Sequence, residues 1–159
     1  MPALYDIESY VTDVVELYES ELNTYIACMN TNKNDSITLP DVNNYYLEPI
    51  LHFGITVSEP FFSYGFVDKL ISQEIASVAP TEITMVFRIG FIQNDIQTDL
   101  TVLKMLLRYQ QVLINVLNQN FNKFAGYGKP AVSAAAPTIC ELEGNVVRSA
   151  EIEVTFILG

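Results

Sequence analysis

The chain has 159 residues, 50% of them apolar and 17% charged, and its 19 acidic and 8 basic residues give a formal net charge of -11. This composition predicts one folded domain with its own core and excludes a disordered, solvating chain. The lack of an apolar run of about 18 residues argues against a membrane span. The negative charge argues against tight nucleic-acid binding through a basic patch.

The cysteines, the first residues and the scarcity of charge bear on compartment and assembly. Cys28 and Cys140 are isolated thiols, which favours a reducing compartment over a disulfide framework. The Met1–Tyr10 segment carries acids and no base, so we expect no secretory signal. Because few charged residues are available to cover the surface, we expect part of it to be buried against other chains in a homo-oligomer.

The first predicted element is a long amphipathic helix. Its apolar residues step by three or four and form one stripe of Leu4, Ile7, Val11, Val14, Tyr18, Leu22, Tyr25 and Met29. The acids between them predict a solvated outer face, with an acidic docking or channel-lining surface as the alternative. Cys28 is expected to pack in the core, and the polar run 30–36 is expected to end the helix.

The middle of the chain predicts strands. Pro49 and Gly54 interrupt a β-favouring stretch, which predicts an edge strand over Pro49–Val57. The aromatic segment Pro60–Phe66 is read as a strand or a docking loop, and residues 69–79 as a short helix. Residues 82–93 predict a strand with one apolar face, formed by Ile83, Met85, Phe87, Ile89 and Phe91.

A second helix is predicted over Leu100–Phe124, after a turn at Asn94–Asp95 and a cap at Thr98 or Asp99. Its apolar arc is too wide for a single sheet face, so part of it must meet the first helix or a neighbouring subunit. A flexible loop is expected near 125–138. A terminal hairpin follows, with its turn at Gly144–Asn145 and one apolar face of Ile152, Val154, Phe156 and Leu158.

This order of elements predicts the α+β class. We expect a single domain over residues 1–159, with one mixed or antiparallel β-sheet packed against two main α-helices.

Motifs that carry catalysis are not found in the sequence. His52 is the only histidine and lies in an apolar stretch, and neither a nucleophile elbow nor a phosphate-binding glycine loop occurs. We therefore expect no catalytic residues, no metal and no cofactor. Carboxylate chemistry is the remaining option, since acids alternate on the two hairpin arms at Glu141, Glu143, Glu151 and Glu153. These acids would bind a basic partner or a cation, or form the centre of a small metal-dependent hydrolase.

The element order and texture resemble the tail terminator, or tail completion, proteins of long-tailed bacteriophages. The resemblance rests on an opening amphipathic helix and on a Pro-interrupted segment at residues 46–51. It also rests on the strand at 83–89, the long helix from Leu100 and the closing strand at 150–156. It covers most of the chain and contains no diagnostic motif. The residues that lie between these elements, Pro60 to Phe66, have no assigned place in such a fold.

The resemblance implies a mixed sheet flanked by helices in a subunit of a ring, commonly a hexamer. Such a ring terminates the tail tube and joins it to neck or head-closure proteins in the virion, after assembly in the host cytoplasm. The family has no catalytic residues. DNA would pass through the ring without specific binding, and a negative lumen would suit that passage. The alternatives are another head–tail connector or tail-tube protein, a small acidic metal-dependent hydrolase, or a small ligand-binding module.

Two surfaces follow from this interpretation. The aromatic side chains of Phe61, Phe62, Tyr64 and Phe66 are expected to be buried between subunits, because they would promote aggregation if exposed. The acids Glu141, Glu143, Glu151 and Glu153 are the candidate lumen or partner face.

Overall fold

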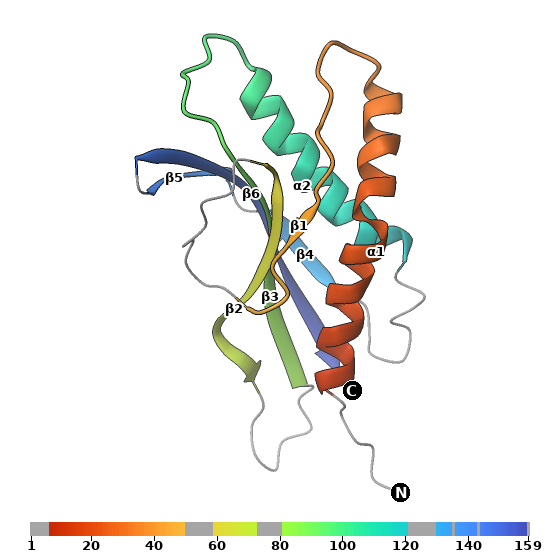
Figure 1. Ribbon diagram of the computed structural model, residues 1–159. Coiled ribbons are helices and arrows are strands. Elements are labelled where there is room, and N and C mark those ends of the chain that lie inside the picture. Colours follow the sequence, from red (N-terminus) through yellow and green to blue (C-terminus); the bar gives the residue numbers. More distant parts are fainter. Residues whose placement is uncertain are drawn as a thin grey trace, which may run out of the picture.

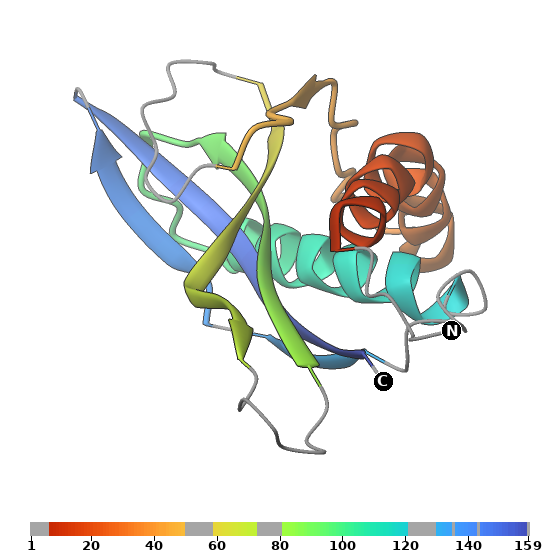
Figure 2. The same cartoon turned by 90° about the horizontal axis from the view of Figure 1, so that it is seen from below.

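The computed structural model describes residues 7–49, 59–72, 81–120, 130–134, 136–142 and 144–158. In these residues a mixed six-stranded sheet carries two helices on one of its faces (Figures 1 and 2), which confirms the predicted α+β fold. The elements in chain order are α1 (Ile7–Lys33), β1 (Asn44–Tyr45), β2 (Phe61–Ser72), β3 (Thr81–Ile92), α2 (Thr101–Gln119), β4 (Ala131–Ala134), β5 (Thr138–Leu142) and β6 (Asn145–Leu158).

The sheet is built around the long antiparallel pair of β3 and β6, which are in register from Thr81 opposite Leu158 to Ile92 opposite Val147. The strand order is β1-β2-β3-β6-β4, and β5 also pairs with β6. β1 is parallel to β2, and every other pairing is antiparallel. β4 and β5 therefore form one edge of the sheet, and β1 forms the other.

Alternation along the central strands places one apolar face against the helices. The odd positions of β3 from Ile83 to Phe91 are buried, as are the even positions of β6 from Ala150 to Phe156. Period-two burial is what a strand with one covered face requires. The prediction of a strand at 82–93 with one apolar face is confirmed.

The two helices pack against each other as well as against the sheet. The ring of Tyr18, on α1, lies fully buried beside Phe62 and Phe87, with ring centroids 5.2 and 4.7 Å away. Its hydroxyl donates to the carbonyl oxygen of Leu113, on α2, over 2.7 Å. Burial raises the pKa of Tyr18 well above its ordinary value, so the hydroxyl stays a donor. Part of the apolar arc of α2 thus meets α1, one of the two predicted contacts.

Two asparagines of α1 hold the extended segment 34–43 to the helix. The Asn30 side chain donates to the carbonyl of Leu39 and accepts from its N–H, at 3.0 and 2.8 Å. Asn23 makes the same pair of hydrogen bonds with Val42, at 2.9 and 2.8 Å. Each side-chain amide therefore does for the backbone of this segment what a neighbouring strand would do.

The other side of segment 34–43 is held by α2. The Tyr109 hydroxyl donates to the carbonyl of Pro40 over 2.7 Å. The Arg108 guanidinium forms an ion pair with Asp35 and also donates to the carbonyl of Ile37 over 3.2 Å. The segment is fixed between the two helices, although only Asn44–Tyr45 after it forms a strand.

Several predicted boundaries differ from the structure. The first helix continues to Lys33, and Asn34 ends it with a left-handed φ of 45°. The aromatic segment belongs to strand β2, which extends to Ser72, so the helix expected at 69–79 is wrong for residues 69–72. Pairing of Ile71 with Ile83 overrides the weak helical pattern there. The edge strand expected over Pro49–Val57 lies almost wholly outside the described residues.

The loop expected near 125–138 contains a strand. Residues 131–134 form β4, which pairs with residues 152–155 of β6. Its side chains are small and mostly exposed, so no alternation marks it in the sequence. The strand forms because the long β6 offers unpaired backbone groups along its outer edge.

Candidate interaction surface

Exposed apolar side chains gather where the first turns of α2 meet the edge of the sheet. Leu100, Leu103 and Leu107 follow one another by three and four residues along one side of the helix, and all three are exposed. The loop before α2 adds Ile96, 89% exposed, and β5 adds Ile139, 65% exposed. We call these five residues the α2–β5 surface. Exposed apolar side chains that gather in this way are typical of interaction sites.

The composition of α2 accounts for the surface. The side of the helix that carries Val102, Leu106 and Leu113 is buried in the core. The stripe from Leu100 to Leu107 lies outside that buried arc, so a single chain leaves it without cover. Contact of this stripe with a neighbouring subunit, the second option for the apolar arc, stays a prediction.

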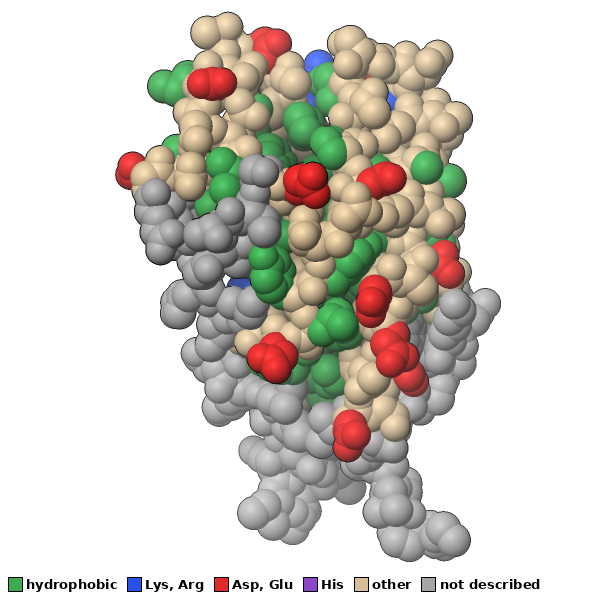
Figure 3. All heavy atoms as spheres, in the orientation of Figure 1, with side chains coloured by type: hydrophobic (Ala, Val, Ile, Leu, Met, Phe, Trp, Pro, Cys, Tyr) green, Lys and Arg blue, Asp and Glu red, His purple; other side chains and the backbone are tan. Residues whose placement is uncertain are grey.

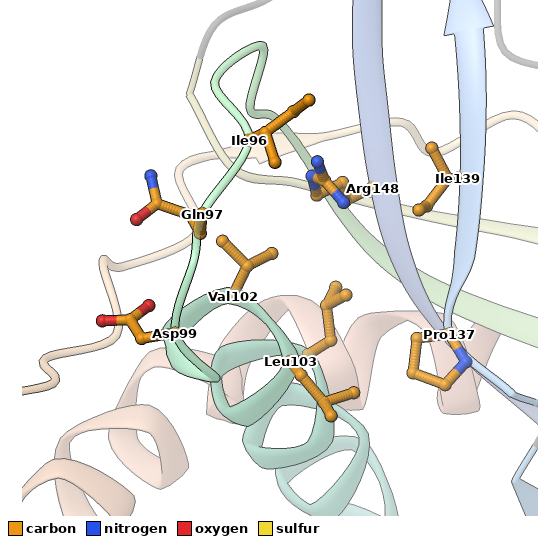
Figure 4. Close-up of a pocket in the computed structure, with 9 residues that line it drawn as sticks. Ile96, Gln97, Asp99, Val102, Leu103, Pro137, Ile139 and Arg148 are labelled. Atoms are coloured by element: carbon orange, nitrogen blue, oxygen red, sulfur yellow. The ribbon is translucent and has the colours of Figure 1, made fainter.

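A cavity of about 340 Å³ opens within the surface. Figure 4 shows it between the loop before α2, the first turns of α2 and strand β5, with Arg148 of β6 at its side. The lining residues are Ile96, Gln97, Asp99, Val102, Leu103, Leu106, Pro137, Ile139 and Arg148. The lining is mostly apolar, with one guanidinium and one carboxylate, so it suits an apolar group that has a charged group beside it.

The two charged groups of the cavity have different roles. Asp99 accepts a hydrogen bond from the N–H of Thr101 over 3.1 Å at the start of α2. Hydrogen bonding from Thr101, first from its side chain and then from its backbone, lowers the pKa of Asp99. The predicted hydrogen bond between Asp99 and a free N–H at the start of α2 is present, but the N-cap residue is Leu100, one position later. Arg148 donates from Nε to the carbonyl of Gln93 over 3.4 Å and is only half-buried.

Four of the five basic side chains that the structure describes divide into two groups, and the fifth, Lys33, is exposed at the end of α1. Arg88 is paired with Glu151, over 2.8 Å, and Arg108 with Asp35. Lys104 and Arg148 lie on or beside the α2–β5 surface, and within the described residues neither forms an ion pair. Figure 3 shows acidic side chains spread over the face on which α1 lies. The exposed acids of α1 are Glu8, Asp13, Glu16 and Glu19.

The aromatic segment lies in the core of the chain itself. Phe62 and Tyr64 are buried against the helices, and Phe66 packs beside them half-buried. Phe61 points to the other face and is fully buried with Val147, Tyr46 and Ile92. Intramolecular contacts therefore cover the rings that were expected between subunits. Because Phe61, Phe62 and Tyr64 are buried within the single chain, their burial does not require a second subunit.

The four predicted acids are not brought together. Glu151 and Glu153 lie on the sheet face away from the helices, with Glu151 paired to Arg88 and Glu153 exposed. Glu141 is opposite Val146, five positions from Glu151 along β6 and therefore roughly 16 Å away. By the register it also lies on the opposite face. Glu143 is outside the described residues.

The remaining candidates for chemistry give no site. Within the described ranges, no group of three or more His, Cys, Asp or Glu side chains is placed to hold a metal ion. His52 lies outside the described residues. Cys28, expected in the core, is exposed instead and lines a groove of about 370 Å³ between α1 and α2. It lies on the exposed side of α1, next to Met29 of the apolar stripe.

Sequence reasoning located part of the α2–β5 surface and missed the rest. The apolar excess of the second helix was visible as an arc wider than one sheet face. Ile96 and Ile139 carried no such signal, because each is a single apolar residue in a polar or short segment. Only the topology, which brings the start of β5 beside the start of α2, places them together.

Comparison of the sequence with protein-family models and with curated proteins finds no match to either. Neither helix of the described residues is long and apolar enough to span a membrane.

Proposed function

We propose that the protein is a structural subunit of a long-tailed bacteriophage particle. In this proposal it forms a ring, hexameric as in the family that it resembles, which terminates the tail tube and joins it to the neck. The α2–β5 surface carries the proposal, because it leaves an apolar patch uncovered in a chain of net charge -11. Such a chain needs a partner to bury that patch.

Two further features support an assembly role. The two-helix α+β architecture is of the kind that the resemblance implies. The excess of acids suits a channel for DNA, since phosphate groups are repelled from a negative wall and do not adhere to it. In the proposal the protein resides in the tail or neck of the virion, and its partners are the tail tube and a head-closure protein.

The test is the mass and shape of the purified full chain, by light scattering and electron microscopy over a range of concentrations. Each measurement is repeated with tail tubes of the same phage. We expect a closed ring of fixed subunit number, formed in solution or at the tube end. A chain that stays monomeric and ignores tubes would contradict the proposal. Rings that bind the capsid portal and ignore the tubes would move the protein to another place in the neck.

A further inference from the structure

The exposed large apolar side chains of the described residues fall on two separate sites. Five of the six make up the α2–β5 surface, and the sixth is Leu47, which is 50% exposed. Leu47 follows β1, the strand at one edge of the sheet, whereas Ile139 is on β5 at the other edge. The chain therefore presents one apolar side chain and one apolar cavity at opposite edges.

Leu47 is held firmly in its exposed position. The backbone N–H of the preceding Tyr46 donates to the carbonyl of Phe62 over 3.0 Å, and the Tyr64 hydroxyl donates to the carbonyl of Leu47 over 2.6 Å. Burial, and then the carboxylate of Glu48, raise the pKa of Tyr64, so its hydroxyl keeps the proton that it donates. The backbone that carries the Leu47 side chain is fixed in this way, so little backbone entropy is lost when the side chain binds.

The residue after Leu47 is complementary in charge to one group of the cavity, Arg148. Glu48 is exposed and directly follows the leucine. The cavity combines apolar walls with the Arg148 guanidinium and the Asp99 carboxylate. Asp99 already accepts a hydrogen bond from the N–H of Thr101 and lies near the charge of Lys104, so Arg148 is the charged group of the lining that is open to an acidic partner. An aliphatic side chain with a carboxylate beside it is the chemistry that this hollow accepts.

We propose that Leu47 and Glu48 of one copy occupy the α2–β5 cavity of a second copy, with Leu47 between the apolar walls and Glu48 paired with Arg148. The two sites are on opposite edges of the sheet, so the contact is head-to-tail and repeats from copy to copy. A repeated head-to-tail contact closes into a ring when its rotation allows. This inference rests on the proposed function and names the contact by which the ring would form.

The decisive experiment mixes two variants of the full chain that are each defective in one site. Leu47→Ser removes the inserted side chain. Ile139→Glu places a carboxylate opposite Arg148, its partner in the β5–β6 register, and so occupies the guanidinium. By sedimentation velocity, each variant alone should associate at least about tenfold more weakly than the parent chain. An equimolar mixture should form a dimer and nothing larger, because each pair keeps one intact contact.

Charge exchange tests the ion pair separately. Glu48→Arg and Arg148→Glu should each weaken association, and the double variant should recover it, because the pair is restored with its signs exchanged. Glu16→Arg makes the same charge change on the exposed face of α1 and should leave association unchanged. Circular dichroism melting of every variant confirms that the fold is retained.

Three outcomes would overturn the inference. If the parent chain assembles and Leu47→Ser assembles equally well, the contact is elsewhere, while the proposed ring stands. If Ile139→Glu fails to assemble while Leu47→Ser still assembles, the surface binds its own copy by two-fold symmetry or binds another ligand. If the parent chain is monomeric at every concentration and with tail tubes, both the contact and the proposed function fail.

Discussion

The guanidinium of Arg108 connects α2 to the segment that follows α1. It is 8% exposed and bonds to both carboxylate oxygens of Asp35, while the carbonyl of Ile37 takes a third hydrogen bond. A bidentate pair with arginine favours the charged form of the carboxyl. Accordingly, hydrogen bonding from Arg108 lowers the pKa of Asp35 from 3.8 to about 2.

This pair predicts a pH dependence of stability. The Asp35 carboxyl has a lower pKa in the folded chain than in the unfolded one, so its contribution is fully present above pH 3.8 and is lost as the pH falls towards about 2. Asp35→Asn should therefore lower the unfolding free energy at neutral pH and make little difference at pH 2. Urea unfolding at a series of pH values measures this.

Asp95→Asn is the matched control, since Asp95 is exposed and forms no ion pair within the described residues. A difference between Asp35→Asn and the parent chain that stays constant down to pH 2 would contradict the assignment.

At the scale of the elements, β2 and β3 pack through the aromatic ring of Phe61 on β2, which lies over Gly90 on β3. Phe61 and Gly90 are directly opposite each other in the register. A Cβ added at Gly90 would come within 2.5 Å of the Phe61 ring, which is fully buried. The ring occupies the space that a side chain at position 90 would need, so the packing of this face depends on the glycine.

Gly90→Ala should lower the unfolding free energy by about 1–3 kcal/mol, because the methyl group displaces the Phe61 ring. Denaturant unfolding measures the change. Phe61→Leu should remove part of that added cost when it is combined with Gly90→Ala, which a double-mutant cycle detects.

Gly144→Ala is the control, because the glycine at position 144 is required by its backbone conformation and not by side-chain packing. Position 144 has a φ of +82° and no atom within 4 Å of an added Cβ, so alanine there should cost about 1–2 kcal/mol by strain alone. Phe61→Leu should not change that cost. Strict additivity of Gly90→Ala and Phe61→Leu would contradict the packing argument.

The elements that could be predicted from the sequence are those whose side chains are sorted by burial. α1, β3, α2 and β6 each have a buried side and a more exposed side, so their periods were visible. β1 and β4 are short and form through backbone pairing with β2 and β6, which leaves no side-chain period. The placement of segment 34–43 depends on Asn23 and Asn30, whose role appears only when the helix and the segment lie side by side.

At the scale of the whole molecule, the exposed acids of α1 and the exposed apolar side chains of the α2–β5 surface lie on different elements. The acids of α1 lie on one side, and the described cations without an acidic partner include the two at the α2–β5 surface. The candidate site was only partly predictable from the sequence. An apolar excess can be counted in a sequence, but whether it becomes core or interface depends on topology. The aromatic side chains of Phe61, Phe62 and Tyr64 are buried in the core, whereas the apolar stripe of α2 from Leu100 to Leu107 is exposed.

The overall charge predicts how the assembled protein treats DNA. We expect the parent ring not to retard duplex DNA in a gel even at low salt, because its subunits repel phosphate. Glu153→Lys changes the charge by two per subunit on the sheet face away from the helices. If that face lines the channel, this variant should retain DNA.

Glu16→Lys makes the same change on the outer side of α1 and should retain less DNA than Glu153→Lys. Equal retention by the two variants would show that net charge alone matters and would contradict a channel lined by the Glu153 face.

The two asparagines of α1 that bind segment 34–43 set the spacing between the residues that they hold. Asn23 and Asn30 are seven residues apart, a rise of about 10.5 Å on a helix, and Leu39 and Val42 are three residues apart, about 10 Å in extended chain. The two lengths agree only at this spacing. An extra residue between Leu39 and Val42 would misalign one amide pair, whereas an extra residue at Ser36 would leave both intact. The spacing from Leu39 to Val42, and with it the start of the chain that leads to Leu47, is thus set by α1.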